Sequence, residues 1–223
     1  FKVMGLAPYA SEHEVQKAYN AAFKNLFGTK NFDIYLKDKP KDLFFHFQNR
    51  LQHCRFDGIA GAVQKSLEEI LVSWIKNCVR KTKINNVIIV GGVAQNIKAA
   101  IPISEIKEVK NFYINPSSGD ATLSIGGCYY ASSLKPNLNL KKLDNIYLGP
   151  NYKSLEIYKI IKNFSLKNRN FVVSKITNNK KIVNLLRKGK ILGRFDGRLE
   201  LGQRALGNRS ILADPRNLET IQL

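Results

Sequence analysis

The residues best suited to chemistry lie in one run, from Gly193 to Arg216, where arginines and glycines alternate with apolar residues. Arginine keeps its charge and carries a planar set of donors that grips a phosphate or a carboxylate at two points. Glycine lets backbone N–H groups approach an anion closely and permits tight turns. The run therefore predicts a site for a phosphorylated or otherwise anionic ligand.

A basic surface loop that simply faces water is the plainer interpretation of this run. That interpretation suits lysine-rich segments, but here every cation is an arginine. The residues between them include several apolar ones: Leu199, Leu201, Ala205, Leu206, Ile211 and Leu212. Apolar residues at this spacing indicate a packed segment. We therefore favour a binding site.

Two further glycine turns could also hold a ligand. In the first, Gly91 and Gly92 lead from a strand into a helix, and Asn96 could add an amide that binds a ribose or a base. In the second, Asp120 follows Gly119 at a helix N-cap position, where it could bind a metal or a phosphate. Each turn also has a plainer interpretation, as a tight strand–helix connection and as an ordinary cap.

Hydrophobic periodicity predicts the elements that position these turns. In the first half we expect helices over 11–27, 57–80, 95–100 and 120–133 and strands over 86–90 and 111–115. The helix over 57–80 has the clearest pattern, with apolar residues at steps of three and four and no proline. Both glycine turns then follow the carboxyl ends of strands, which is typical of an α/β layered fold.

A polar stretch with proline and glycine, residues 136–150, predicts a linker. After it the pattern predicts helices over 155–163 and 178–188 and strands over 170–175 and 191–195. The last of these strands leads directly into the run of arginines and glycines. The whole chain is thus expected to be of the α/β class.

The formal net charge of +19 raises the possibility of nucleic-acid binding through counterion release. Residues 136–223 carry 18 Lys and Arg against 6 Asp and Glu, while residues 1–135 carry 18 against 11. Many of these lysines are scattered among asparagines and isoleucines, and no basic strand carries the aromatic residues that stack bases. Nucleic acid is therefore an unlikely partner from sequence. No apolar stretch is long enough for a membrane span, and three cysteines without metal-type spacing suggest a reduced, cytoplasmic protein.

The order of the motifs resembles that of the NodU-type O-carbamoyltransferases. The segments that carry the resemblance are Lys2–Tyr9, Gly91–Asn96, Ser118–Ala121, Tyr147–Pro150 and Gly197–Arg216, of which the last is the most specific. The resemblance implies the C-terminal part of an ASKHA (actin-like ATPase) domain over residues 1–135. A linker over 136–150 and the N-terminal part of a YrdC-like domain over 151–223 would follow, so the chain is expected to be a fragment of a longer protein and to be inactive alone.

The resemblance also implies a reaction and its site. ATP and carbamoyl phosphate would form carbamoyl adenylate, and the carbamoyl group would pass to a hydroxyl of a small-molecule or sugar acceptor. The implied catalytic residues are Arg198, Arg204 and Arg209, and the implied carbamoyl phosphate ligands are Arg204, Asn208, Arg209 and Ser210. The implied nucleotide-binding residues are Gly91, Gly92, Asn96 and Gly119, with ATP and Mg²⁺ as cofactors.

Asp120 matches the metal-binding aspartate of that family, which works with two histidines of an H-x-x-x-H pair. The three histidines of this chain, at positions 13, 46 and 53, do not have that spacing. The partners of Asp120 in a site for Fe²⁺ or another divalent metal are therefore expected to lie before Phe1.

Two other classes stay open from sequence. One comprises other carbamoyl- or threonylcarbamoyl-transfer proteins, including the hydrogenase-maturation carbamoyltransferases. Those place the YrdC-like module first, which the order of motifs here argues against. The second is a basic, non-catalytic module that binds nucleotides or nucleic acid.

Overall fold

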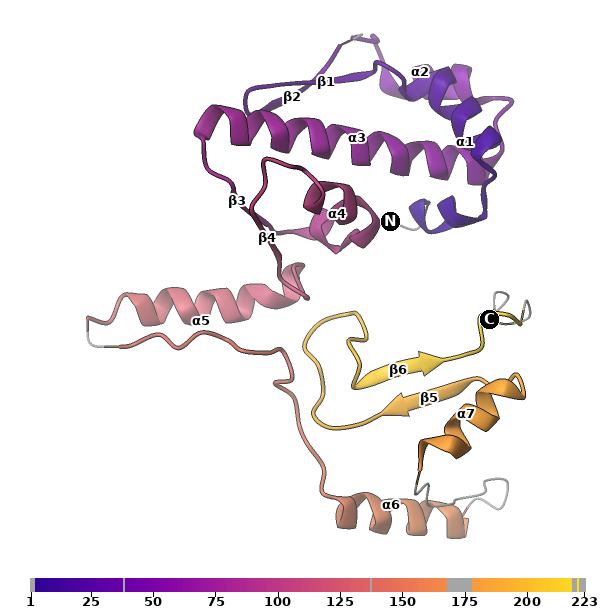
Figure 1. Cartoon of the computed structure of the whole chain (residues 1–223), viewed down its shortest axis with the longest axis vertical. Coiled ribbons are helices and arrows are strands. Elements are labelled where there is room, and N and C mark those ends of the chain that lie inside the picture. Colours follow the sequence, from indigo (N-terminus) through magenta and orange to yellow (C-terminus); the bar gives the residue numbers. More distant parts are fainter. Residues whose placement is uncertain (1–2, 38, 137, 168–177, 218–219, 221–223) are drawn as a thin grey trace. The chain divides into compact units, whose positions relative to one another are not determined.

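The computed structural model describes residues 3–37, 39–136, 138–167, 178–217 and 220. Its contacts divide the chain into two compact units, Phe1–Asp120 and Ala121–Leu223 (Figure 1). The first unit carries the two glycine turns, and the second carries the run of arginines and glycines.

The first unit is organised by one long helix, α3 (Phe56–Thr82). Its apolar residues recur on two faces, and it ends at Lys83, which has a left-handed φ of 62°. The 3₁₀-helix η1 (Met4–Tyr9), α1 (Glu12–Ala18) and the π-helix η2 (Tyr19–Phe23) contact α3, and α2 (Leu43–Leu51) contacts η2. α1 packs closely because Gly61 of α3 has no side chain: a Cβ there would lie 2.4 Å from Val15 Cγ2.

The core of this unit has two parts along α3. Ala18, Ala22, Phe23 and Ala62 form one buried cluster at the amino-terminal half of α3. The other cluster lies at its carboxyl-terminal half and joins α3 to the crossover helix, with Leu71, Ile75, Val79, Ala99, Ile103 and Ile106. Residues of α3 thus pack against both the helical segments before it and the sheet after it.

Two small sheets complete the first unit. β1 (Phe27–Lys30) and β2 (Asp33–Leu36) form an antiparallel hairpin, with Phe27 opposite Leu36. β3 (Asn86–Ile89) and β4 (Asn111–Ile114) pair in parallel, with Asn86 opposite Asn111. The 3₁₀-helix η3 (Gly92–Gln95) and α4 (Ile97–Ser104) connect the parallel strands. This β–α–β arrangement places the carboxyl ends of β3 and β4 at the same sheet edge.

In its described residues, the second unit contains three α-helices and a hairpin. After η4 (Asp120–Thr122) come α5 (Leu123–Ser133), α6 (Ser154–Lys167) and α7 (Asn179–Arg187). β5 (Leu192–Phe195) and β6 (Arg209–Leu212) pair antiparallel, from Leu192 opposite Leu212 to Phe195 opposite Arg209. The described residues between Asn139 and Lys153 form no helix or strand.

The mixed α/β character is confirmed, and α3, β3, β4, α7 and β5 begin and end within a few residues of their predicted positions. The predicted helix over 11–27 is shorter, because it changes to a π turn after Ala18 and ends at Phe23. The β1–β2 hairpin, α2 and β6 were not predicted. The strand expected over 170–175 lies outside the described residues. No helix in the described part of the chain is long and apolar enough to cross a membrane.

Candidate functional site

The run of arginines and glycines forms the β5–β6 hairpin and the loop of residues 196–208 that joins its strands, here called the arginine loop. Three glycines of this loop have positive φ angles: 69° at Gly197, 102° at Gly202 and 117° at Gly207. Side chains with a Cβ rarely adopt such angles, so the recurrence of glycine reflects the turns of the loop. The loop is therefore a folded structure.

A buried carboxylate organises the arginine loop. The side chain of Glu200 is 0% exposed, and its Oε1 accepts hydrogen bonds from the N–H groups of Leu206 (3.0 Å) and Asn208 (2.7 Å). Its Oε2 accepts from Arg209 Nε at 3.1 Å. Burial by itself raises the pKa of Glu200, but these donors outweigh it and lower the pKa below its ordinary value. Glu200 is therefore held ionised at neutral pH.

Arg209, the first residue of β6, binds acceptors in the loop. Besides the Glu200 carboxylate, its Nη2 donates to the carbonyl oxygens of Glu200 (3.3 Å), Gly202 (3.2 Å) and Arg204 (3.4 Å). A guanidinium with this many protein acceptors shapes the loop by holding its turns together. Arg209 therefore helps to hold the loop in shape. The resemblance implies that it also binds the ligand.

Arg198 joins the loop to the Tyr147–Pro150 segment. Its Nε donates to the carbonyl of Gly149 at 3.0 Å, and its Nη2 donates to the carbonyl of Leu148 at 3.4 Å. The backbones of the two segments are paired as well: the N–H of Gly149 donates to Leu199 at 2.9 Å. Two motifs that lie about 50 residues apart in the sequence therefore form one structure.

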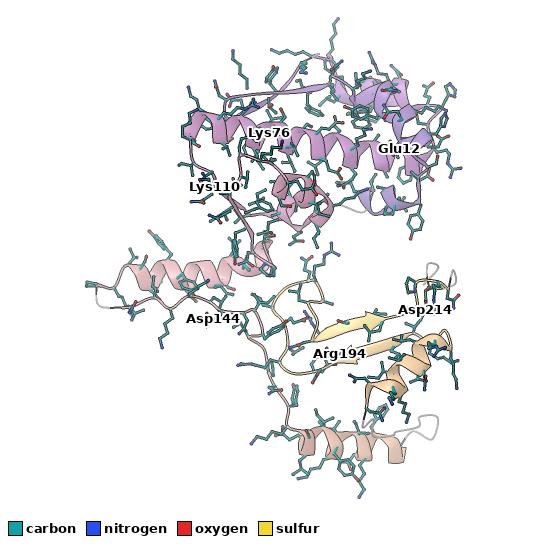
Figure 2. The ribbon with its side chains drawn as sticks, viewed as in Figure 1. Glu12, Lys76, Lys110, Asp144, Arg194 and Asp214 are labelled. Atoms are coloured by element: carbon teal, nitrogen blue, oxygen red, sulfur yellow. The ribbon has the colours of Figure 1, made fainter. Side chains whose placement is uncertain are left out.

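The other predicted residues of the hairpin and its loop differ in how many hydrogen bonds and ion pairs they form within the chain. Asn208 Nδ2 donates to the carbonyl of Arg198 at 2.8 Å, and Ser210 Oγ lies 3.5 Å from the carbonyl of Gly207. Arg194 on β5 pairs with Asp196 at 2.8 Å (Figure 2). Arg204 is exposed and its guanidinium has no hydrogen bond or ion pair with any described residue. Arg204 is therefore the loop arginine whose charge is available to a ligand.

The two glycine turns of the first unit meet, as their positions after parallel strands predict. The N–H of Gly91, whose φ is 89°, donates to the carbonyl of Ser118 at 2.9 Å. The Gln95 side chain lies against Gly119, where a Cβ would be 2.2 Å from Gln95 Nε2. Nothing lies within 4 Å of a Cβ built on Gly91 or on Gly92. The surface over these two glycines is consequently open to a ligand.

Asn96 has an internal role in this arrangement. Its Oδ1 accepts from the N–H of Ala99 at 3.1 Å and caps α4, and its Nδ2 donates to Gln64 Oε1 at 2.9 Å. Gln64 is only 5% exposed, so the amide pair is part of the interior. Close by, the hydroxyl of Ser118 is buried without a hydrogen-bond partner in the described structure. The sequence pattern gave no role to Gln64, and it singled out Ser118 only as part of the Ser118–Ala121 motif.

Asp120 is exposed at the start of η4. Among the residues that the structure describes, no three His, Cys, Asp or Glu side chains gather to form a possible metal site. His46 binds the carbonyl of Ala22 through Nε2 at 3.0 Å, and His13 lies 3.5 Å from Glu14. The described residues do not form a complete centre for Fe²⁺, which needs several convergent ligands.

Comparison with known families supports the assignment of the motifs. The family model described as "Carbamoyltransferase N-terminus" matches residues 1–129, which include both glycine turns. The model described as "Carbamoyltransferase C-terminus" matches residues 183–223, which include β5, β6 and the arginine loop. The chain belongs to the carbamoyltransferase family.

Curated relatives agree with this assignment. An uncharacterized protein of Methanocaldococcus jannaschii is 32% identical over 74% of this chain and 27% of its own length. The nodulation protein NolO of Bradyrhizobium diazoefficiens is 26% identical over 98% of this chain and 40% of its own length. The nodulation protein NolNO of Sinorhizobium fredii is 26% identical over 97% and 32%. The chain spans between about a quarter and two fifths of the lengths of these relatives.

Proposed function

We propose that this chain is part of an ATP-dependent O-carbamoyltransferase. One ATP, one carbamoyl phosphate and one water would give carbamoyl adenylate, pyrophosphate and phosphate. An acceptor hydroxyl would then attack the carbamoyl carbon and displace AMP. The acceptor would be a small molecule or a sugar. Membership of the carbamoyltransferase family supports the transferred group, and the arginine loop supports an anionic donor.

The observation that carries this proposal is the free guanidinium of Arg204 in a loop whose other arginines are engaged. Carbamoyl phosphate and ATP are polyanions, and an arginine can clamp a phosphate with two parallel hydrogen bonds. Arg204 would bind the phosphate and offset the charge that develops during adenylation. Arg198, Arg209 and Asn208 would hold the loop in the conformation that presents Arg204, and Ser210 would add a hydrogen bond to the donor.

In the first unit, the glycine turns would form the nucleotide site. The open surface over Gly91 and Gly92 lets a phosphate or ribose approach the backbone, and Gly119 lies in the adjoining turn. Asn96 would act by fixing the start of α4, because both ends of its amide have partners in the chain. These contacts support nucleotide binding by the backbone more than by side chains.

The domain organisation belongs to the same proposal. Residues 1–135 would be the C-terminal part of an ASKHA-type domain, 136–150 a linker and 151–223 the start of a YrdC-like domain. ATP with Mg²⁺, and Fe²⁺ or another divalent metal near Asp120, would be the cofactors of the whole protein. Asp120 has no convergent partner among the described residues.

Pyrophosphate release tests the proposal. The full-length protein that contains this chain is incubated with ATP, with and without carbamoyl phosphate, and pyrophosphate is measured. Release should require carbamoyl phosphate, and Arg204→Ala should reduce it by about 10²–10³-fold, as expected for loss of a charge-stabilising donor. Arg187→Ala, which removes an exposed arginine of α7 in the same unit, should leave the rate unchanged.

Two outcomes would contradict the proposal. If Arg204→Ala retains the native rate, the assigned role of Arg204 is wrong. If the protein releases no pyrophosphate but binds arbitrary DNA or RNA with a steep salt dependence, unaffected by carbamoyl phosphate, the basic binding module is the better description.

A further inference from the structure

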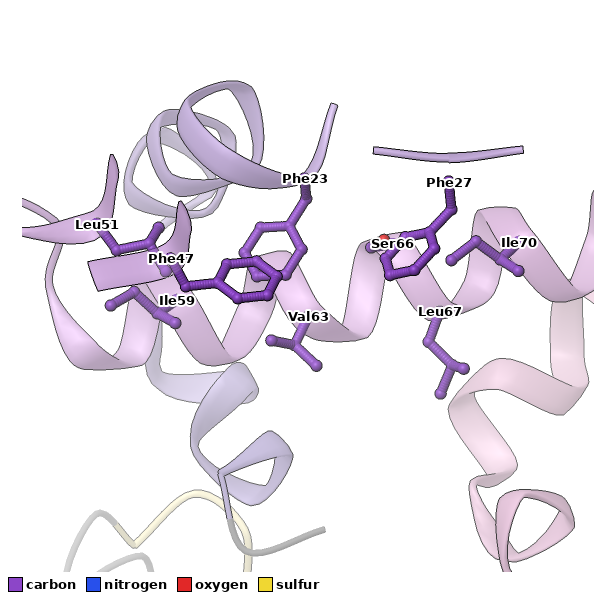
Figure 3. Close-up of a pocket in the computed structure, with 9 residues that line it drawn as sticks. All are labelled: Phe23, Phe27, Phe47, Leu51, Ile59, Val63, Ser66, Leu67 and Ile70. Carbon is purple, nitrogen blue, oxygen red and sulfur yellow. The ribbon is translucent and has the colours of Figure 1, made fainter. Parts of the chain in front are cut away.

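A cavity of about 520 Å³ lies on the first unit beside the amino-terminal half of α3 (Figure 3). Its walls come from η2, β1, α2 and α3 and consist of three phenylalanines, five aliphatic residues and Ser66. Phe23 and Phe47 stack there with ring centroids 5.1 Å apart. Its walls therefore suit an apolar group with the volume of a small molecule.

A second cavity of about 190 Å³ adjoins the first and differs from it in chemistry. The two share Phe23, Phe27, Ser66 and Ile70 in their linings, so they are direct neighbours. The second cavity is polar, and its walls include the side chains of Tyr19, Asn25, Thr29, Lys37, Glu69 and Ser73. A molecule that spans both cavities must be apolar at one end and polar at the other.

Ser66 marks the boundary between the two cavities. It is only 5% exposed, lines both cavities, and its hydroxyl makes no hydrogen bond with any described residue. Ser66 Oγ is not among the polar atoms that are fully buried without a partner, so it faces space that a ligand atom can reach. A ligand atom at the boundary would supply the partner that Ser66 lacks.

The polar cavity favours a neutral, hydroxyl-bearing group. Its walls offer a carboxylate and an ammonium group together, from Glu69 and Lys37, so they select neither sign of charge. Its hydroxyls are arranged in pairs that can both donate and accept: Tyr19 donates to Glu69, and Thr29 Oγ1 lies 2.6 Å from Ser73 Oγ. Sugar-like hydroxyls match such a surface, because each can also donate and accept.

We propose that the two cavities form one binding site for a small neutral amphiphile. Its apolar chain fills the cavity lined by phenylalanines, its hydroxyl-bearing head occupies the polar cavity, and Ser66 bonds the atom that joins them. The site lies among η2, β1, α2 and α3, whereas the glycine turns follow β3 and β4, so this inference does not depend on the proposed carbamoyl transfer.

The test uses octyl glucoside, an alkyl chain on a neutral sugar, below its micelle concentration. Calorimetric titration of the purified chain should show saturable binding of one molecule, with no binding of glucose and weaker binding of octyl sulfate. Val63→Phe, which fills the apolar cavity, should abolish binding. Ser66→Ala should weaken it about threefold to tenfold, the effect of one hydrogen bond.

Ile84→Phe is the matched control, because it adds bulk at an exposed aliphatic residue after α3 that lines neither cavity. It should bind octyl glucoside as the native chain does. Absence of saturable binding to the native chain overturns the proposal, as does binding that Val63→Phe leaves unchanged. Unchanged affinity in Ser66→Ala, whose fold the small substitution should preserve, overturns the role of Ser66. If a polypeptide segment occupied the site, octyl glucoside would not bind, and that result would also count against the proposal.

Discussion

The glycine turns of the first unit and the arginine loop of the second are both glycine-rich connections that follow strands, yet they are stabilised differently. The turns meet through a backbone hydrogen bond between Gly91 and Ser118, and a neutral amide pair, Gln64 and Asn96, supports them. The arginine loop folds around the buried charge of Glu200, which binds Arg209 and two backbone amides. One region presents open backbone, and the other presents Arg204, whose guanidinium has no partner among the described residues.

The difference shows that a charge-rich motif does not present all its charges to a ligand. Arg198 and Arg209 use their donors on carbonyl and carboxylate groups of the chain, so they contribute to the loop's shape. A loop in which one buried anion gathers several donors fails as a unit when that anion is lost. The neutral turns, whose bonds are distributed, should lose stability in smaller steps.

The largest expected effect is that of Glu200→Ala. The substitution leaves Arg209 and the amides of Leu206 and Asn208 without their shared acceptor, so the loop should lose its fixed conformation. Carbamoyl phosphate-dependent pyrophosphate release should fall at least as far as in Arg204→Ala. Backbone amide resonances of residues 202–209 should move toward random-coil positions.

Asp144→Ala is the control for Glu200→Ala, since it removes an exposed acid of the same unit (Figure 2). It should leave the loop resonances and the rate in place. If Glu200→Ala retained native loop resonances, the buried carboxylate would not be the organising group.

The next effect concerns the amide pair of the first unit. Asn96→Ala removes the cap of α4 and leaves the Oε1 of the buried Gln64 without its donor, while Gln64 Nε2 keeps its hydrogen bond to Glu68. The change should cost about 1–3 kcal/mol of the free energy of unfolding. Urea denaturation measures this cost. In a double-mutant cycle with Gln64→Ala, the two changes should be less than additive; full additivity would show that the pair does not couple.

The pH dependence of stability should differ between the two units. In the second unit, the Arg216 guanidinium lowers the pKa of Asp214 from 3.8 to about 2, so its stabilising contribution is complete above pH 4 and is lost as the pH falls toward 2. Glu200, whose pKa is also lowered, acts in the same direction. The β5–β6 hairpin should therefore lose amide protection on the acid side.

The loss of stability at alkaline pH reports on the first unit. Burial and the hydrogen bond to Glu69 raise the pKa of Tyr19 from 10.0 to about 12. The folded state then keeps a proton that the unfolded chain releases, so stability falls as the pH rises from 10 toward 12. Absorbance titration should show a late tyrosine that Tyr19→Phe removes; a Tyr19 that titrates near pH 10 would contradict the structure.

Much of this fold could be predicted from local patterns, because α3, β3 and β4 bury regular apolar faces. α2 was not predicted, although Phe47 and Leu51, four residues apart, pack partly buried against the first core cluster; no residue of α2 is fully buried. β6 was missed because it lies inside the run of arginines and glycines, where turn-forming residues dominate. In each case the tertiary context decided the outcome.

The site shows the same limit at the level of side chains. The positions of the turns could be predicted, because tight turns need glycine locally. The partners were not predicted, because Gln64 lies 32 residues from Asn96 and Arg198 lies 49 residues from Gly149. Glu200 had a visible signal, as the one acidic residue between Arg198 and Arg209, but its burial follows only once the loop closes.

The smallest expected effect is a difference in the free energy of unfolding among variants of the arginines in and beside the loop. Arg204→Ala should change the free energy of unfolding by no more than about 0.5 kcal/mol, because its guanidinium has no partner among the described residues. Arg209→Ala should destabilise the chain clearly, since it leaves the buried Glu200 carboxylate without its cation. Arg198→Ala should fall between them. Thermal unfolding of the three variants measures the order, and equal losses would mean that the loop does not separate a free arginine from those that hold it together.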